Sequence, residues 1–228
     1  MSLYKSRQRG SVIFPALLNA FVRIYTRLKV EGQENLPLEG SFLIAANHQS
    51  HADTAMIFAA VPKVIRKRFV AAAAQDYFFQ GGLPQYFSRV WFNAIPVARD
   101  RRGGRDPMRH LGRALREGYA VMMFPEGTRS SGELPGPFRA GIGKLLAEFP
   151  ETPVVPTWIG GTARVLPKGV YVPRPFRTYV RFGSPLLIKA HPRFRATWQS
   201  AADEIREAIL QLGDYPVMVS DSGEAEAE

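Results

Sequence analysis

The stretch SFLIAANHQSHAD, Ser41 to Asp53, joins an apolar run to a polar loop that holds two of the chain's four histidines. The run from Phe42 to Ala46 has no polar residue, which is typical of a strand buried on both faces of a sheet. A helical pattern begins at Asp53 and is stopped by Pro62. The stretch therefore predicts a strand, a polar loop and a helix in succession.

The same alternation of apolar runs and helical patterns continues along the chain. It predicts an α/β fold, with a mainly parallel or mixed sheet flanked by helices. Asp106 and Pro107 are suited to the cap and the first position of one helix. We expect further strands at 69–74, 91–97, 119–124, 154–159 and 178–182, and helices at about 107–117, 139–149 and 195–212.

Composition narrows the classes of protein to consider. The chain has 228 residues, of which 46% are hydrophobic, enough for one domain with a sizeable core. It contains no cysteine, which excludes disulfides, thiolate zinc sites and a cysteine nucleophile. The net charge of +10 predicts attraction to polyanions such as nucleic acid, anionic lipid or phosphorylated substrates.

The N-terminal segment SVIFPALLNAFVRIYTRLKV, residues 11–30, is apolar, but Asn19, Arg23 and Arg27 interrupt it, which argues against a membrane-spanning helix. It also lacks the cleavage site of a secretory signal. On a helix, those three residues share one face. Another face carries Leu18, Phe21, Val22, Tyr25 and Leu28. This pattern favours a helix in the membrane interface, and the alternative is a helix that packs on the protein's own core.

His48 and Asp53 suit a general base and the carboxylate that orients it. Two other interpretations stay open on the residues alone. Asp53 is also a good helix cap. Together with His51, the pair is also a legitimate ligand set for a metal, although the chain has no HExxH motif.

A second polar loop, FPEGTRSSG, covers Phe124 to Gly132 and follows the apolar run 119–124. Gly127 permits a tight turn, and Arg129 is suited to binding a phosphate in a forked geometry. The alternative is a polar turn in which Glu126 and Arg129 pair locally. A basic loop that includes Arg99 follows another strand, where the alternative to phosphate binding is a solvated surface.

The order of these motifs resembles the glycerolipid acyltransferases of the 1-acylglycerol-3-phosphate acyltransferase type. The family's N-H-x4-D motif is matched by Asn47, His48 and Asp53, and its F-P-E-G-T-R-S motif by residues 124–130. An apolar run ending in arginine is matched by 95–99, and an apolar run with a proline by 154–156. One departure is Arg139, since the family often has lysine after the phenylalanine at this position.

The resemblance implies a mechanism and a set of site residues. His48 would remove a proton from the acceptor hydroxyl, Asp53 would orient His48, and the hydroxyl oxygen would attack an acyl thioester directly. No covalent acyl-enzyme is implied, in agreement with the absence of a GxSxG nucleophile elbow. The acceptor would be bound by residues of the second and third motifs: Arg99, Glu126, Gly127, Thr128 and Arg129.

The resemblance also implies partners and a location. No bound cofactor or metal is expected, because acyl-CoA or acyl-carrier protein serves as co-substrate and a lysophospholipid as acceptor. We expect residues 1–30 to associate with an anionic membrane at its cytoplasmic face, 31–215 to form the acyltransferase domain, and 216–228 to be an acidic disordered tail. The different-class alternative is a basic nucleic-acid-binding protein, which explains the charge but neither polar loop.

Overall fold

The computed structural model describes residues 13–74, 94–97, 108–130, 134–167, 169–170 and 172–213. Within these residues the strands are β1 (Lys29–Glu31), β2 (Phe42–Ala46), β3 (Phe69–Ala74), β4 (Ile95–Val97), β5 (Ala120–Met123), β6 (Val154–Gly160) and β7 (Tyr179–Phe182). The helices are α1 (Ile13–Tyr25), α2 (Ala52–Ala60), α3 (Lys63–Arg66), α6 (Arg109–Arg116), α7 (Gly141–Glu148), α8 (Thr162–Val165) and α9 (Arg195–Leu212), with a 3-10 turn η2 at Gln33–Asn35.

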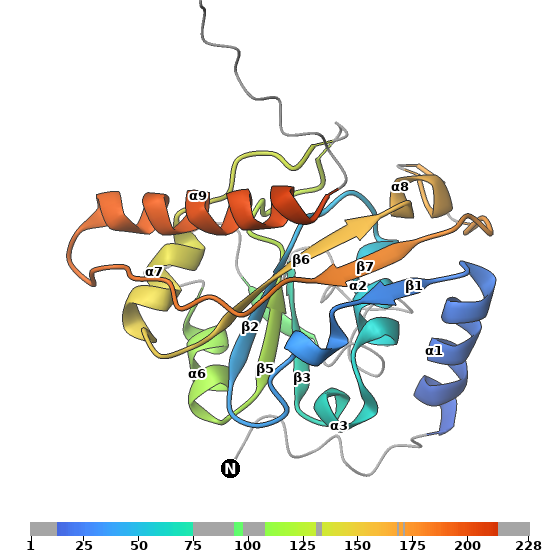
Figure 1. Ribbon diagram of the computed structural model, residues 1–228, viewed down its shortest axis with the longest axis horizontal. Coiled ribbons are helices and arrows are strands. Elements are labelled where there is room, and N and C mark those ends of the chain that lie inside the picture. Colours follow the sequence, from blue (N-terminus) through green and yellow to red (C-terminus); the bar gives the residue numbers. More distant parts are fainter. Residues whose placement is uncertain are drawn as a thin grey trace, which may run out of the picture.

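The described strands form one mixed sheet in the order β1-β7-β6-β2-β5-β3-β4. Strands β6, β2, β5, β3 and β4 run parallel to one another, whereas β7 pairs with β6 antiparallel and with β1 parallel. The carboxyl ends of β2 and β5 therefore lie side by side at one edge of the sheet, with β6 on the other side of β2 (Figure 1).

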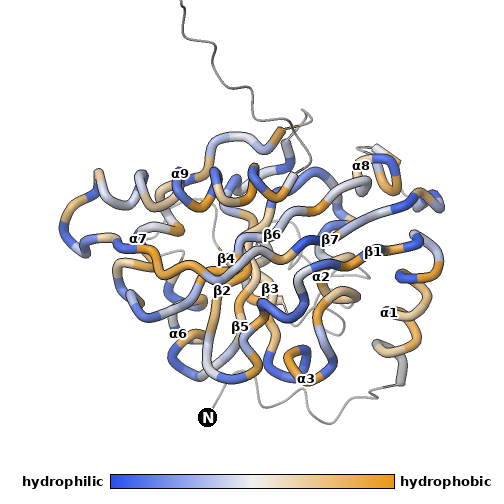
Figure 2. Tube along the Cα trace, viewed as in Figure 1, coloured by the Kyte–Doolittle hydropathy of each residue, from blue (hydrophilic) through white to orange (hydrophobic). Residues whose placement is uncertain are grey.

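Alternate residues of β2 pack into two separate cores, one on each face of the sheet. Phe42 and Ile44 contact the core beneath α1 and α2, while Leu43 and Ala45 contact the core beneath α6, α7 and α9. Every residue of β2 is buried, which explains its unbroken apolar sequence. The hydrophobic residues accordingly concentrate in the central strands (Figure 2).

The expected mixed α/β architecture is confirmed, and each predicted strand overlaps an observed one. Three short elements were not predicted: β1, α3 and α8. They have three or four residues each, which is too few for a hydrophobic period to appear. Asp106 and Pro107 lie outside the described residues, as does the predicted tail 216–228.

Helix α1 lies against α2 with a face that coincides only in part with the predicted apolar face. Val22 of the apolar face is buried, but so is Asn19 of the polar face, while Phe21 is 55% exposed. The guanidinium of Arg23 donates to the carbonyl of Ala59 near the end of α2, 3.1 Å away. Over the described ranges, we find no helix with the length and apolarity needed to cross a bilayer.

Helix α9 packs closely on α7, and the contact depends on Gly143. A Cβ atom at Gly143 would collide with the backbone carbonyl of Trp198 in α9. By contrast, a Cβ at Gly141, two residues earlier in the same helix, would meet only the methyl group of Met108, at 3.0 Å. The close approach of α7 and α9 therefore requires a glycine at position 143 but not at position 141.

We predict that Gly143→Ala lowers the free energy of unfolding by about 1–3 kcal/mol, because α7 and α9 must separate to admit the methyl group. The matched control Gly141→Ala should leave stability unchanged or raise it by up to about 1 kcal/mol through helix propensity. Urea unfolding followed by circular dichroism measures both. Equal stabilities for the two variants would contradict the proposed close contact.

Candidate active site

Two polar loops meet at the carboxyl ends of β2 and β5. Because β2 and β5 are parallel neighbours in register from Phe42 and Ala120, the loops that follow them leave the sheet at the same edge. The first loop contains His48 and leads into α2, and the second is the stretch from Phe124 to Ser130. Their adjacency follows from the strand order.

Asn47 anchors the start of the first loop. Its side-chain amide donates to the carbonyl of Ile159 at 2.9 Å and accepts from the N–H of Ile159 at 2.8 Å. The fully buried side chain thus pairs with β6 as a backbone amide would. This pairing fixes the point at which the chain leaves β2.

The side chain of His48 is held by Asp53, in the first turn of α2. The distance from His48 Nδ1 to Asp53 Oδ2 is 2.8 Å, and the side chain of His48 is 18% exposed while that of Asp53 is fully buried. The same carboxylate oxygen accepts the N–H groups of Gln49 and Ser50, at 2.7 and 2.8 Å. Three donors therefore fix the orientation of the carboxylate.

This geometry assigns the proton on the imidazole. A carboxylate can only accept, so the proton of neutral His48 resides on Nδ1, and Nε2 carries the free lone pair. Nε2 is then the atom that can take a proton from a bound hydroxyl. The arrangement has the chemistry of a general base and its orienting partner.

Glu126 connects the second loop to the backbone of the first. Its Oε1 accepts the N–H of His48 at 2.7 Å, and its Oε2 accepts the N–H of Gly136 at 3.0 Å. Burial raises the pKa of Glu126, whereas the N–H bonds from His48 and Gly136 act in the opposite direction. Its carboxylate is thus occupied by backbone donors, and among the described residues it forms no ion pair with Arg129.

Ser130 and Phe124 complete the contacts between the two loops. The backbone N–H and the hydroxyl of Ser130 both donate to the carbonyl of His48, at 2.8 and 3.1 Å. The ring of Phe124 stacks on the imidazole with centroids 4.0 Å apart and planes within 10°. His48 is therefore held through its N–H, its carbonyl and its ring.

Gly127 and Arg139 shape the second loop. Gly127 has a φ of 70°, in the left-handed region that favours glycine. Arg139, where the sequence departs from the family pattern, donates from Nε to the carbonyl of Glu126 at 3.1 Å. A positive side chain at this position thus secures the turn on which Glu126 lies.

The remaining predicted site residues are placed as follows. Thr128 is exposed, and Arg129 is half-buried near His51. Burial lowers the pKa of His51, and the charge of Arg129 lowers it further. Arg99 lies outside the described residues, but β4, which precedes it, is three strands from β2, roughly 14 Å at the usual strand spacing.

The metal alternative requires His48, His51 and Asp53 to direct free ligand atoms at one point. Asp53 Oδ2 already accepts three N–H groups, and His48 Nδ1 faces that oxygen. Among the residues that the structure describes, no group of three or more His, Asp or Glu side chains is arranged to hold a metal ion.

Several contacts at the site were not anticipated from the sequence. Phe124 was assigned to the end of a strand and the start of the FPEGTRS motif without a contact to His48, and no role was given to Gly136 or to the side chain of Asn47. The crowding of polar groups in the second loop was the available signal for Ser130. Nothing in the sequence indicates that Gly136 donates to Glu126, because the contact depends on how the loop folds back.

Comparisons with known proteins agree with these contacts. Residues 27–160 match the acyltransferase family. A chloroplastic 1-acyl-sn-glycerol-3-phosphate acyltransferase of Brassica napus is 30% identical over 166 residues, which cover 68% of this chain and 44% of the relative. The Bacillus subtilis enzyme of the same name is 26% identical over 129 residues, covering 57% of this chain and 60% of the relative. The chain thus spans about half the length of the curated relatives it matches.

The fold is also similar to a solved structure, the 1-acyl-sn-glycerophosphate (LPA) acyltransferase PlsC of Thermotoga maritima. The TM-score is 0.68 with 22% sequence identity, over 94% of this chain and 88% of that chain. At this identity the likeness shows the fold alone. The family match covers more than half of the sequence and includes both loops that meet at His48. The chain therefore belongs to the acyltransferase family.

Proposed function

We propose that the protein transfers a fatty acyl group from an acyl thioester to the free hydroxyl of 1-acylglycerol-3-phosphate, giving phosphatidic acid. The observation that carries the proposal is the 2.8 Å contact between His48 and Asp53, which leaves Nε2 free. The names of the relatives support the acceptor, and acyl-CoA and acyl-carrier protein are both suitable donors.

The proposed reaction needs no covalent intermediate. His48 Nε2 takes the proton of the acceptor hydroxyl as its oxygen attacks the thioester carbonyl. The tetrahedral intermediate collapses, the carbon–sulfur bond breaks, and the imidazolium returns the proton to the departing thiolate. Asp53 stabilises the positive charge that His48 carries between these two steps.

In this proposal Arg129 binds the phosphate of the acceptor, and Arg99 from the second motif assists it. The guanidinium of Arg129 has no carboxylate partner among the described residues, so its charge is available to an anion. Thr128 is exposed beside it and could donate a hydroxyl to the same phosphate. Glu126 and Gly127 do not contact the phosphate in this proposal and instead set the shape of the loop that carries Arg129.

The proposal includes an anionic membrane surface, where the acceptor resides, with residues 1–30 as the associating segment. The cytoplasmic face is the proposed side of the membrane. The support is the basic and apolar composition of residues 1–30, which contain no acidic residue; the first acid of the chain is Glu31.

The first test is the base. We predict that His48→Ala and Asp53→Asn each lower kcat by about 10²–10⁴-fold, because proton transfer to a positioned base accelerates a reaction by about that factor. Release of free CoA from acyl-CoA with a panel of lysolipid and glycerol-3-phosphate acceptors measures the effect. Full activity of His48→Ala on every acceptor would show that the base is a different residue.

The second test separates two roles for Glu126. If the residue positions His48, Glu126→Gln should lower kcat by up to about 10²-fold with little change in acceptor KM, since the misplaced imidazole loses reactive geometry. Glu148→Gln, on the exposed side of α7, is the control. A raised KM with normal kcat would instead mean that Glu126 contacts the acceptor, as its motif predicts.

The third test concerns Arg129. We predict that Arg129→Ala raises the KM for 1-acylglycerol-3-phosphate about tenfold to hundredfold, as expected for a charge-assisted hydrogen bond. A neutral monoacylglycerol acceptor should show no such change. Arg113→Ala is the control, because Arg113 pairs with Glu117 on α6, 2.9 Å away. An unchanged KM for the phosphate-bearing acceptor would exclude Arg129 from phosphate binding.

A further inference from the structure

An exposed apolar stripe runs along α1. Leu17, Phe21 and Ile24 are 65%, 55% and 78% exposed, and their spacing of four and three residues places them on one side of the helix. A fourth exposed apolar side chain, Val172 at 74%, lies in the connection between β6 and β7, residues 161–178. Figure 2 shows hydrophobic residues on α1 beside hydrophilic ones at the tip of this connection.

The β6–β7 connection is fastened to α1 by several hydrogen bonds. The hydroxyl of Tyr25 donates to the carbonyl of Pro173 at 2.9 Å, and the N–H of Thr178 donates to the carbonyl of Thr26 at 3.0 Å. The hydroxyls of Thr26 and Thr178 also bond, at 3.0 Å, in a buried position. The C-terminal end of α1 and the connection therefore lie side by side (Figure 1).

That surface is basic and has almost no acid to neutralise it. Residues 152–202 contain no aspartate or glutamate, and neither do residues 1–30. Glu31, the acidic residue of β1, forms ion pairs with Lys29 at 2.6 Å and with Arg181 at 2.7 Å. Five exposed arginines of α1, its C-terminal end and the connection have no carboxylate partner among the described residues: Arg23, Arg27, Arg164, Arg174 and Arg177.

The same connection touches the loop that carries His48. The hydroxyl of Ser50 donates to the carbonyl of Leu166 at 2.9 Å, and the N–H of Arg174 donates to the carbonyl of Val165 at 2.8 Å. Arg164 lies over the ring of Phe176, 4.3 Å from its centroid, which secures the outer part of the connection. The basic surface is therefore continuous with the active-site loop.

We propose that α1 and the β6–β7 connection together form one docking surface for an anionic lipid bilayer, with the connection supplying most of the charge. The positive charge attracts polyanions in general. The exposed apolar side chains, however, are stabilised only by a partner with an apolar interior, which favours an anionic bilayer over nucleic acid. The inference rests on the proposed function in one respect: the acceptor is a lipid, which such docking would bring to His48.

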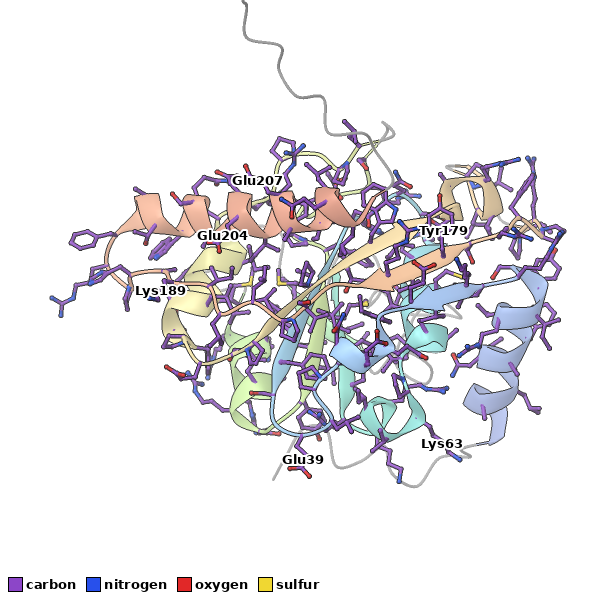
Figure 3. The ribbon with its side chains drawn as sticks, viewed as in Figure 1. Glu39, Lys63, Tyr179, Lys189, Glu204 and Glu207 are labelled. Carbon is purple, nitrogen blue, oxygen red and sulfur yellow. The ribbon has the colours of Figure 1, made fainter. Side chains whose placement is uncertain are left out.

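The test measures binding of the full chain to sucrose-loaded vesicles of phosphatidylcholine with 30% phosphatidylglycerol, without acyl donor. We expect Arg174→Gln/Arg177→Gln to weaken the partition about tenfold to thirtyfold, since each arginine near an anionic surface contributes to binding. The control Arg193→Gln/Arg195→Gln removes the same charge at the start of α9, at the end of the molecule where Figure 3 labels Lys189, away from Tyr179 of β7.

A second pair of variants tests the apolar part. Phe21→Ser/Ile24→Ser should weaken vesicle binding. The control Leu187→Ser/Phe194→Ser should not; these two residues lie between β7 and α9 and are 61% and 62% exposed. Each pair replaces one phenylalanine and one aliphatic residue, so total hydrophobicity changes alike. Equal effects within either matched comparison would overturn the proposal.

Two further measurements distinguish this proposal from neighbouring ones. Turnover of a short-chain acceptor dissolved as monomers should be normal in Arg174→Gln/Arg177→Gln, because docking is not needed for a soluble substrate. If wild-type protein binds the vesicles as predicted but shows no acyl transfer, the proposed function fails and the docking surface stands. If these arginines are needed to retain duplex DNA and not vesicles, the surface binds nucleic acid.

Discussion

The hydrogen bond from the N–H of His48 to Glu126 is the interaction on which the site depends. It joins two loops that are 78 residues apart in the sequence and that follow neighbouring parallel strands. Without a fixed backbone, the imidazole would be oriented only by its bond to Asp53 and its stacking on Phe124. Because Ser130 also holds the carbonyl of His48, the peptide groups on both sides of the residue are restrained. The position of His48 is thus fixed by two loops together.

The two cores explain why this arrangement is stable at the edge of the sheet. Strand β2 is buried on both faces, so its register with β5 and β6 is held by apolar packing on each side. Asn47 then extends the pairing with β6 by one side-chain amide beyond the end of the strand. A buried carboxylate at Asp53 is tolerated because Oδ2 is supplied with three donors where the loop enters α2.

Much of the fold could be predicted from the sequence because buried parallel strands are unbroken apolar runs, as in β2 and β5. The short elements β1 and α8 could not, because three or four residues show no hydrophobic period, and β1 forms only by pairing with the distant strand β7. At the site, the spacing of His48 and Asp53 left other interpretations open, and the pair was predicted from its combination with the FPEGTRS motif. It could not indicate that Glu126 faces inward, because that orientation follows from Gly136 and Arg139 folding over the turn.

The order of residues in FPEGTRS has a physical explanation in the direction that each side chain takes. Gly127 adopts a φ of 70°, which reverses the chain between Glu126 and Thr128. Glu126, before the glycine, is only 5% exposed and accepts the N–H of His48, while Thr128, after it, is exposed. Arg129 then lies near His51, where its charge disfavours the protonated form of that ring and is available to an anion. One turn thus holds the backbone of His48 through Glu126 on one side of the glycine and presents the guanidinium of Arg129 on the other.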